Sequence, residues 1–481
     1  MKSYYANPNV RARMIEYLGG DSFERATCEY LTAGDEGGSN HRQPLPVAEL
    51  PRLWDHDLDI SRSLWDHNSL LLHLDIEYVN LDSPAAPYVR PGRVIELQRR
   101  VEWSVDAVLL DYGIAPLHLL SGRGHHYVWR IPQQSSAFES LAGLCAMPTS
   151  LDQFYERGHR PNNRAIPSIL GNASLGLGLV MEYLAHRIKE LAAPMCEIPV
   201  ELTAVEVGPS HQGREMISID ISEYGDPLSS RVVRVPFSFY LKPRQQSALI
   251  GNKIVEKLPP IFLIPLDGID SSQGAALMRD VNQVLELAAR TSVRIPEQSQ
   301  GTEALIGAYL DSSVARFHRW FYSAEQHPAE AWPKTYDSLS MDNLPPCARY
   351  ILEHPNDLLL KPAGVERVVR VLLSLGWHPR HIAGLIRSKF ERPYQWGTQW
   401  NGYVPALRAD FYTRLFAGLF VAGLDDLIDF NCQSAKEERF CFVNPCTNNL
   451  EPFRASLLDR RHYERLACRP FNRLFLPKEH L

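Results

Sequence analysis

The sequence predicts an α+β protein, in which a mixed α/β domain is followed by a mostly α-helical C-terminal domain. Short runs with β-type alternation recur between residues 61 and 250, and helical stretches separate them. After a proline-rich turn at residues 258–265 the apolar periodicity becomes mostly helical. We therefore expect four regions: an N-terminal extension (1–60), a mixed α/β core (61–250), a helical linker region (251–340) and a helical C-terminal domain (341–481).

Two periodicities define the expected elements. The strand-like runs are LLLHLDIEYV, APLHLL, HHYVWRI, EMISIDIS and RVVRVPFSFYL. The helical runs cover residues 95–109, 177–191, 275–289, 302–322 and 365–375. A loop rich in Pro, Ser and Asp at residues 328–346 separates the linker region from the C-terminal domain. The first 60 residues mix short helical stretches with a polar loop and indicate no particular chemistry.

The composition is that of a soluble globular protein, with 45% hydrophobic and 22% charged residues in 481. The first residues lack the apolar stretch of a signal peptide, and the longest apolar run, Leu415–Leu424, is too short to cross a bilayer. We therefore expect a cytoplasmic protein with no membrane partner. A net charge of -6 gives no overall attraction for nucleic acid, so any such contact must be local. The lack of a Walker-type phosphate loop argues against a helicase.

Two carboxylates share one face of the first long strand-like run. The strand period of two puts His73, Asp75 and Glu77 on one face and apolar residues on the other. Adjacent carboxylates repel each other unless a cation lies between them, so the pair suits Mg²⁺ or Mn²⁺. The alternative is an amphipathic strand with a solvated acidic face.

A glycine-flanked hairpin follows in PLHLLSGRGHHYVWRI. We expect a tight turn whose Gly122 and Gly124 can take positive φ at little steric cost, and this turn gathers Ser121, Arg123 and His126 at one end. A guanidinium, a hydroxyl and an imidazole there could bind phosphate oxygens. The alternative is a surface hairpin with a polar tip.

A third acid and a basic run come later in the α/β region. In EMISIDIS, Ser218 and Asp220 share a face, so Asp220 could join the first two carboxylates from a neighbouring strand. The run RVVRVPFSFYLKPR then supplies cations suited to a triphosphate or a template backbone. Alternatively, Asp220 is a solvated strand residue and the basic run is an exposed edge.

Taken in chain order, these motifs resemble the archaeo-eukaryotic primase (primase-polymerase) superfamily, and most closely its small catalytic subunit. The motifs are an apolar run with D-x-E, then S-G-R-G-x-H, then an apolar run ending in Asp, and R-x-P-F-S-x-x-x-K. The resemblance covers about residues 66–245. It implies a primase-polymerase catalytic core, which is an RRM-like sheet packed beside a second small α/β unit.

The resemblance also implies roles for individual residues. Asp75, Glu77 and Asp220 correspond to the catalytic metal ligands. The residues that correspond to the nucleotide-binding motifs are Ser121, Arg123, His126, Arg234, Ser238 and Lys242. The chain departs from the family at Tyr240, where the family usually has His, and this puts one triphosphate contact in doubt.

Four late cysteines form a second candidate site. Thiolates from distant stretches can converge on one zinc ion or one iron-sulfur cluster. The order of Cys347, Cys432, Cys441 and Cys446 resembles the C-terminal domain of the large primase subunit, which implies a [4Fe-4S] cluster. Cys468 could replace one of the four, and unligated thiols are the alternative.

The sequence therefore predicts a template-directed nucleotidyltransferase, a DNA primase or primase-polymerase that uses two-metal phosphoryl transfer. Its expected partners are nucleoside triphosphates, a single-stranded DNA or RNA template, and a helicase or other replication or defence proteins. One alternative is a non-catalytic nucleic-acid-binding factor with a primase fold. Another is a metal-dependent phosphodiester hydrolase that uses Asp75, Glu77 and His126.

Overall fold

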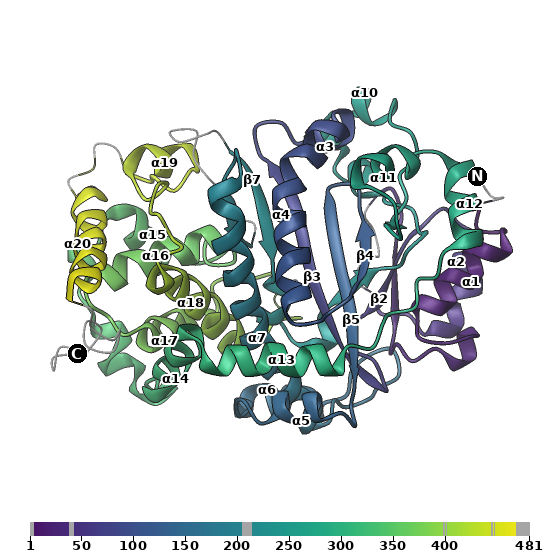
Figure 1. Ribbon diagram of the computed structural model, residues 1–481. Coiled ribbons are helices and arrows are strands. Elements are labelled where there is room, and N and C mark those ends of the chain that lie inside the picture. Colours follow the sequence, from purple (N-terminus) through teal and green to yellow (C-terminus); the bar gives the residue numbers. More distant parts are fainter. Residues whose placement is uncertain are drawn as a thin grey trace.

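A computed structural model describes residues 4–37, 43–203, 214–397, 400, 402–443, 446 and 448–467, with 462–467 described by backbone only. Figure 1 shows a half built around β-sheet on the right and a helical half on the left. The buried apolar residues of both halves belong to one continuous core. The α+β class expected from the sequence is therefore confirmed.

The main sheet has six strands in the order β6-β7-β3-β5-β4-β9. Its longest strand, β3, pairs antiparallel with β5 on one side and with β7 on the other, whereas β6 and β7 are parallel. The strands are β3 (Ser69–Asn80), β4 (Leu117–Leu120), β5 (Gly124–Pro132), β6 (Val200–Leu202), β7 (Glu215–Asp220) and β9 (Ile264–Pro265). The hairpin expected at residues 116–131 is β4 and β5.

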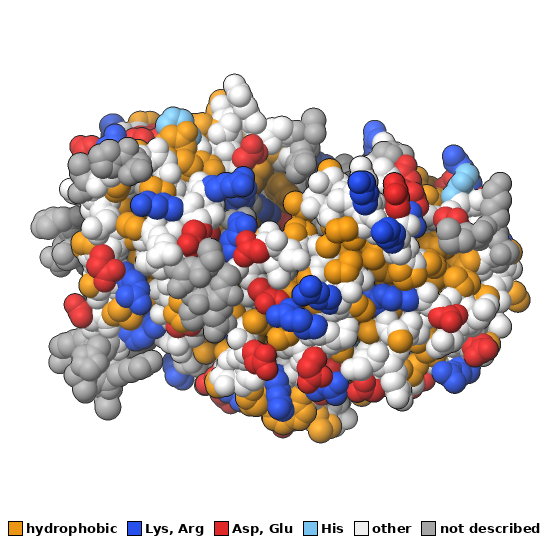
Figure 2. Space-filling view, turned by 90° about the horizontal axis from the view of Figure 1, so that it is seen from above, with side chains coloured by type: hydrophobic (Ala, Val, Ile, Leu, Met, Phe, Trp, Pro, Cys, Tyr) orange, Lys and Arg blue, Asp and Glu red, His pale blue; other side chains and the backbone are white. Residues whose placement is uncertain are grey.

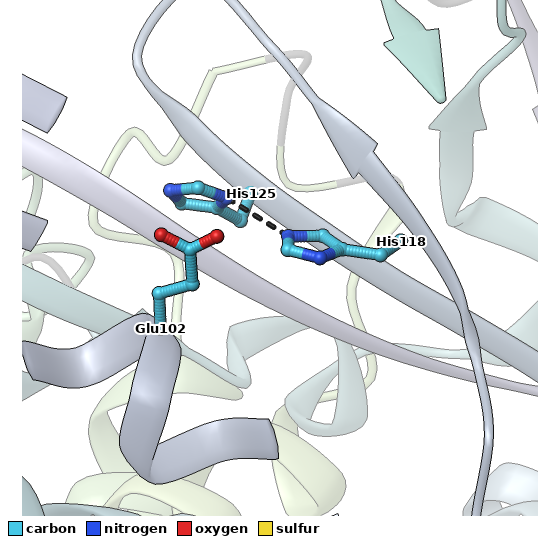
Figure 3. A group of neighbouring side chains, drawn as sticks. All are labelled: Glu102, His118 and His125. Atoms are coloured by element: carbon cyan, nitrogen blue, oxygen red, sulfur yellow. Dashed lines mark hydrogen bonds between the residues drawn. The ribbon is translucent and has the colours of Figure 1, made fainter. Parts of the chain in front are cut away.

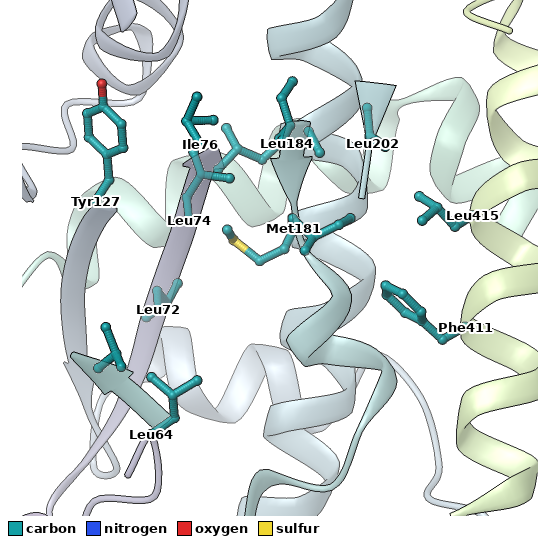
Figure 4. Close-up of a cluster of buried hydrophobic side chains, with 14 of the residues drawn as sticks. Leu64, Leu72, Leu74, Ile76, Tyr127, Met181, Leu184, Leu202, Phe411 and Leu415 are labelled. Carbon is teal, nitrogen blue, oxygen red and sulfur yellow. The ribbon is translucent and has the colours of Figure 1, made fainter. Parts of the chain in front are cut away.

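One face of the main sheet is covered by two long helices, α4 (Pro91–Asp111) and α7 (Ser168–Ala192), which pack side by side (Figure 1). Leu74 and Ile76 of β3 point toward Met181 and Leu184 of α7 (Figure 4). All four side chains are buried. Because strand residues alternate between faces, the odd-numbered residues of β3 must point away from these helices.

A second, three-stranded antiparallel sheet consists of β1 (Leu31–Gly34), β2 (Asp59–Ser63) and β8 (Val232–Arg234), in the order β1-β2-β8. Strand β1, from the N-terminal 60 residues, thus pairs with β2, which crosses the expected boundary at residue 60 and continues the sheet to β8. Likewise β9, from the expected linker region, pairs with β4. At each expected boundary, near residues 60 and 250, strands from the two sides therefore belong to the same sheet.

Several helices end where a capping residue interrupts the apolar periodicity. The helix expected at residues 275–289 is two helices, because the Asp280 side chain accepts hydrogen bonds from the backbone at the start of the second. Ser312 similarly divides the helix expected at residues 302–322.

The strand expected from residue 231 ends at Arg234, since Pro236 has no N–H and Phe237 adopts a φ of 64°.

The remaining helices pack around this framework, and the later ones form the helical half in Figure 1. They are α1 (Pro8–Tyr17), α2 (Leu50–Leu53), α3 (Ala86–Val89), α5 (Ser136–Ala142), α6 (Thr149–Glu156), α8 (Lys242–Gln245), α9 (Ser247–Ile250), α10 (Asn252–Val255), α11 (Ser271–Leu277), α12 (Val281–Arg290), α13 (Ser299–Asp311), α14 (Ser313–Ser323), α15 (Pro346–Glu353), α16 (Pro362–Ser374), α17 (Pro379–Phe390), α18 (Pro405–Ala422), α19 (Cys432–Glu437) and α20 (Glu451–Ala467).

One helical segment among the described residues, Ser168–Met195, is long and apolar enough to cross a membrane by length and composition. Its most apolar stretch is 72% buried inside the protein. It packs against α4, α5 and the main sheet, so this segment has the surroundings of a core helix in a soluble protein.

Candidate active site and cysteine-lined cavity

The three acids expected to act together lie on adjacent strands. In the antiparallel pairing of β3 with β7, Asp75 lies directly opposite Asp220. On the other side of β3, Asp75 lies opposite His126 of β5. Glu77 lies two residues further along the same face of β3, opposite Ser218. The expectation that carboxylates from separate strands meet at one place is confirmed.

Glu77 is held by two cations from different segments. Its carboxylate forms ion pairs with Arg123, in the loop between β4 and β5, and with Lys242 at the start of α8. The Lys242 Nζ to Glu77 Oε1 distance is 3.0 Å. Burial alone would raise the pKa of Glu77, but these two cations outweigh burial and hold the pKa well below its usual range.

Among the described residues, no Lys or Arg forms an ion pair with Asp75 or Asp220. Burial raises the pKa of Asp75 well above its usual value, and the negative charge of Glu77 raises it further. The pKa of Asp220 is raised by the same two causes. Asp75 Oδ1 is buried with no hydrogen-bond partner among the described residues, although His126 Nδ1 lies 3.5 Å away. An unsatisfied carboxylate oxygen between two other acids fits a hard divalent cation such as Mg²⁺ or Mn²⁺.

A row of imidazoles lies beside the acids. His73 Nδ1 is 2.8 Å from Glu223 Oε2, and His73 Nε2 is 2.9 Å from His126 Nδ1. Burial lowers the pKa of His73, but Glu223 outweighs burial and raises it overall, whereas burial and His73 lower the pKa of His126. This pattern favours a protonated His73 that donates to both neighbours and fixes the ring of His126. Glu223 was missed in the sequence analysis, and His73 was placed on the acidic face without a role.

The loop between β4 and β5 is tight for a different reason from the one expected. The Ser121 hydroxyl accepts hydrogen bonds from the backbone N–H groups of Arg123 and Gly124, at 3.4 and 3.2 Å. The turn does not use the positive φ that glycine allows, because neither Gly122 nor Gly124 has it. Close approach explains both glycines: a Cβ at residue 124 would lie 1.8 Å from the carbonyl oxygen of Ile76, and one at 122 would lie 2.5 Å from the Tyr240 ring.

In the basic run after β7, some residues contact the acids and others stabilise the fold. Only Lys242 of its three predicted site residues pairs with a site carboxylate. Arg234 instead forms a bidentate pair with the buried Asp59, at 2.6 and 3.0 Å, and lies over the Tyr240 ring. Ser238 is buried, and its hydroxyl donates to the carbonyl of Ile60 at 3.3 Å. Tyr240 therefore packs between Arg234 and Gly122.

The four predicted cysteines surround one cavity of about 210 Å³ in the helical half. They come from the start of α15 (Cys347), the start of α19 (Cys432) and the segment before α20 (Cys441 and Cys446). Cys432 Sγ accepts a hydrogen bond from the backbone N–H of Leu450 at 3.4 Å. Burial raises the pKa of Cys347 to about 11, so a bound metal would be needed to keep it a thiolate at neutral pH. Cys468 lies outside the described residues.

Surface charge agrees with the modest net charge of the sequence. On the face shown in Figure 2, acidic and basic side chains are interspersed, and Lys and Arg side chains stand beside a hollow near the middle of the view. No extended basic surface is visible on that face, so electrostatic attraction for a polyanion would have to be local.

No family model, no curated protein and no solved structure matches this chain. The functional interpretation therefore depends on the geometry and chemistry of the chain's own residues.

Proposed function

We propose that this protein is a template-directed nucleotidyltransferase of the primase-polymerase kind, which makes or extends primers on single-stranded DNA or RNA. The observation that supports this most strongly is the pairing of Asp75 with Asp220 across two strands, with Glu77 beside them and Arg123 and Lys242 at the same place. We infer that the two-sheet arrangement around these residues corresponds to a primase-polymerase catalytic core.

Asp75, Glu77 and Asp220 would hold Mg²⁺ or Mn²⁺. When bound there, such ions promote attack by a 3′ hydroxyl and stabilise the charge on the departing pyrophosphate. The unsatisfied Asp75 Oδ1 and the raised pKa values of two of the acids support this assignment, because both are costs of burying carboxylates that a cation would remove.

Arg123 and Lys242 would bind the triphosphate of the incoming nucleotide. Both side chains form ion pairs with Glu77. If a metal ion bound the Glu77 carboxylate, these ion pairs would weaken and both side chains could bind phosphate oxygens. Cation and nucleotide would therefore bind cooperatively. His126 would use its Nε2 for a phosphate oxygen, because His73 occupies its Nδ1.

The cysteine-lined cavity supports a second proposal, a metal centre in the C-terminal half. Four cysteines around one cavity suit either a [4Fe-4S] cluster or zinc, and the backbone N–H that points at Cys432 Sγ is the type of hydrogen bond that stabilises a ligating thiolate. The centre would join α15 and α19 to the segment before α20. It would stabilise this part of the helical half.

The test is nucleotide incorporation by the purified chain on a single-stranded template, with labelled nucleotides and Mn²⁺ or Mg²⁺. We expect product from the wild type and none from an Asp75→Ala, Glu77→Ala double variant. Asp111→Ala, which removes an exposed acid at the end of α4, should retain full activity. If wild type and double variant give equal product, the proposal is wrong.

Two other outcomes would identify the alternatives. Tight binding of single-stranded DNA without incorporation would indicate a nucleic-acid-binding factor with this fold. Release of mononucleotides from the template, without release of pyrophosphate, would indicate a phosphodiester hydrolase at the same carboxylates.

A further inference from the structure

Two histidines and a glutamate form a cluster on the opposite face of the main sheet from the acids (Figure 3). Glu102 comes from α4, His118 from β4 and His125 from β5. One potential ligand atom from each of the three residues lies within 4.8 Å of the others. In Figure 3 the Glu102 carboxylate points toward the ring of His125.

The strand register separates this cluster from the proposed active site. His126 lies opposite Asp75, whereas its neighbour His125 lies opposite Ile76, whose side chain points toward the covering helices. Adjacent residues of a strand point to opposite faces, so the sheet lies between the two groups. An ion bound by the cluster would therefore be a different ion from those held by Asp75, Glu77 and Asp220.

Buried polar atoms in the cluster lack partners. His125 is completely buried, and its Nε2 has no hydrogen-bond partner among the described residues. The neighbouring Tyr127, which stacks on His118 at 4.2 Å between ring centroids, has a buried hydroxyl that is equally unsatisfied. An unsatisfied buried polar group costs about 1–3 kcal/mol, so the unpartnered Nε2 of His125 favours an additional ligand in this cluster.

The ligand atoms suit a transition-metal ion. His118 Nε2 and His125 Nδ1 are 2.9 Å apart. Two nitrogens on a tetrahedral Zn²⁺ with bonds of about 2.0–2.1 Å lie about 3.3 Å apart, so only a small separation of the rings is needed. Burial lowers the pKa of both imidazoles, which keeps them in the neutral form that binds metal. Ser271 Oγ donates a hydrogen bond to Glu102 and orients its carboxylate.

We propose that Glu102, His118 and His125 bind one Zn²⁺ ion, with water as a fourth ligand, and that this ion fastens α4 to the β4–β5 hairpin. Two imidazoles and one carboxylate form a ligand set that zinc commonly takes in proteins, whereas Mg²⁺ prefers oxygen ligands alone. Arg123 lies in the loop between β4 and β5, so the ion would stabilise the hairpin that positions this residue.

The test is metal binding by the full chain, after removal of metal with a chelator. Co²⁺ serves as the probe, because tetrahedral Co²⁺ absorbs visible light and replaces Zn²⁺ with similar ligands. A Cys441→Ser, Cys446→Ser background removes two thiols of the other candidate site, so that thiolate bands do not interfere. Glu102→Gln and His118→Gln are the test variants, and His56→Gln is the control because His56 is exposed and outside the cluster.

We expect the background chain and the His56→Gln control to show a visible tetrahedral Co²⁺ band that saturates at one equivalent and that Zn²⁺ abolishes. Glu102→Gln should weaken this binding at least 10-fold, the lower limit typical for loss of a group that supports a metal. His118→Gln should abolish it. Unfolding of metal-free samples checks that the variants are folded. Equal Co²⁺ binding by the background chain and both test variants, or no band in any folded sample, would overturn the proposal.

Discussion

Asp75 on β3 lies directly opposite Asp220 on β7, and Asp75 Oδ1 has no hydrogen-bond partner among the described residues. Two neighbouring buried carboxylates without a cation are unfavourable, and burial together with Glu77 raises the pKa of both. The site therefore gives up stability that a bound divalent ion would restore. Active sites commonly contain ionisable groups whose pKa values are shifted in this way.

Gly124 should be essential for the fold, because the backbone of β3 fills the space that a side chain would need. The Cβ of Gly124→Ala would lie 1.8 Å from the Ile76 carbonyl oxygen, so β3 and β5 must separate. We expect a loss of about 1–3 kcal/mol or more in the free energy of unfolding, measured with urea. Gly307→Ala is the control, since nothing lies within 4 Å of that position in α13, and it should gain about 0.5–1 kcal/mol. Equal effects would contradict the close contact.

Arg234 should matter to stability, since its bidentate partner Asp59 is fully buried. Arg234→Leu would leave that carboxylate without its charged partner, and we expect a loss of about 3–5 kcal/mol in the free energy of unfolding. Arg244→Leu is the matched change at an exposed pair with Glu36 and should cost no more than about 1 kcal/mol. A loss at Arg234 no larger than at Arg244 would show that the Asp59 pair does not stabilise the packing of β2 against β8.

The acid stability of the protein should depend on Glu182, which joins α7 to α14 and α18. Its carboxylate pairs with Arg414 and lies 3.0 Å from His318. Burial alone would raise its pKa, but Arg414 and His318 outweigh burial and lower the pKa from 4.5 to about 2.

A lowered carboxylate pKa stabilises the folded state above pH 4.5, and this contribution of about 3 kcal/mol is lost as the pH falls toward 2. Unfolding free energies measured between about pH 6 and pH 3 should therefore fall more steeply for the wild type than for Glu182→Gln. Parallel curves for the two proteins would rule out this role.

The C-terminal metal centre predicts a specific pattern of metal loss. Cys441→Ser should reduce the iron or zinc bound per chain and lower the thermal unfolding temperature, because Cys441 lines the cavity with the other three thiols. Cys145→Ser should change neither quantity, since Cys145 lies in a different cavity near Arg414. Metal analysis together with visible absorption distinguishes iron-sulfur from zinc. Metal-free wild-type protein, purified without oxygen, would contradict the proposal.

The strand alternation in the sequence was enough to place the acids. The period of two put Asp75, Glu77 and Asp220 on common faces, and the structure pairs their strands in the register that brings them together. The grouping of the four cysteines could also be predicted, although their spacing alone left the site ambiguous.

Features that depend on tertiary contacts could not be predicted. Strand β2 carries the buried polar residues Asp59 and Arg62, which pair with Arg234 and Asp66 outside the strand, so it shows no apolar alternation. The glycines at 122 and 124 suggested a turn with positive φ, whereas the need is for space against Tyr240 and Ile76. Glu223 reaches the site only because β7 places it beside His73.

The central claim is that the three carboxylates carry out nucleotidyl transfer, and Asp220→Asn tests it most directly. Asparagine can still accept the hydrogen bond that Asp220 Oδ1 receives from Ser222 N, at 2.9 Å, so the fold should be kept while a metal-binding charge is lost. The measurement is pyrophosphate release together with labelled product on a single-stranded template. We expect the two in equal amounts from the wild type and a rate lower by about 100-fold or more in the variant. A folded Asp220→Asn variant with the wild-type rate would contradict the claim.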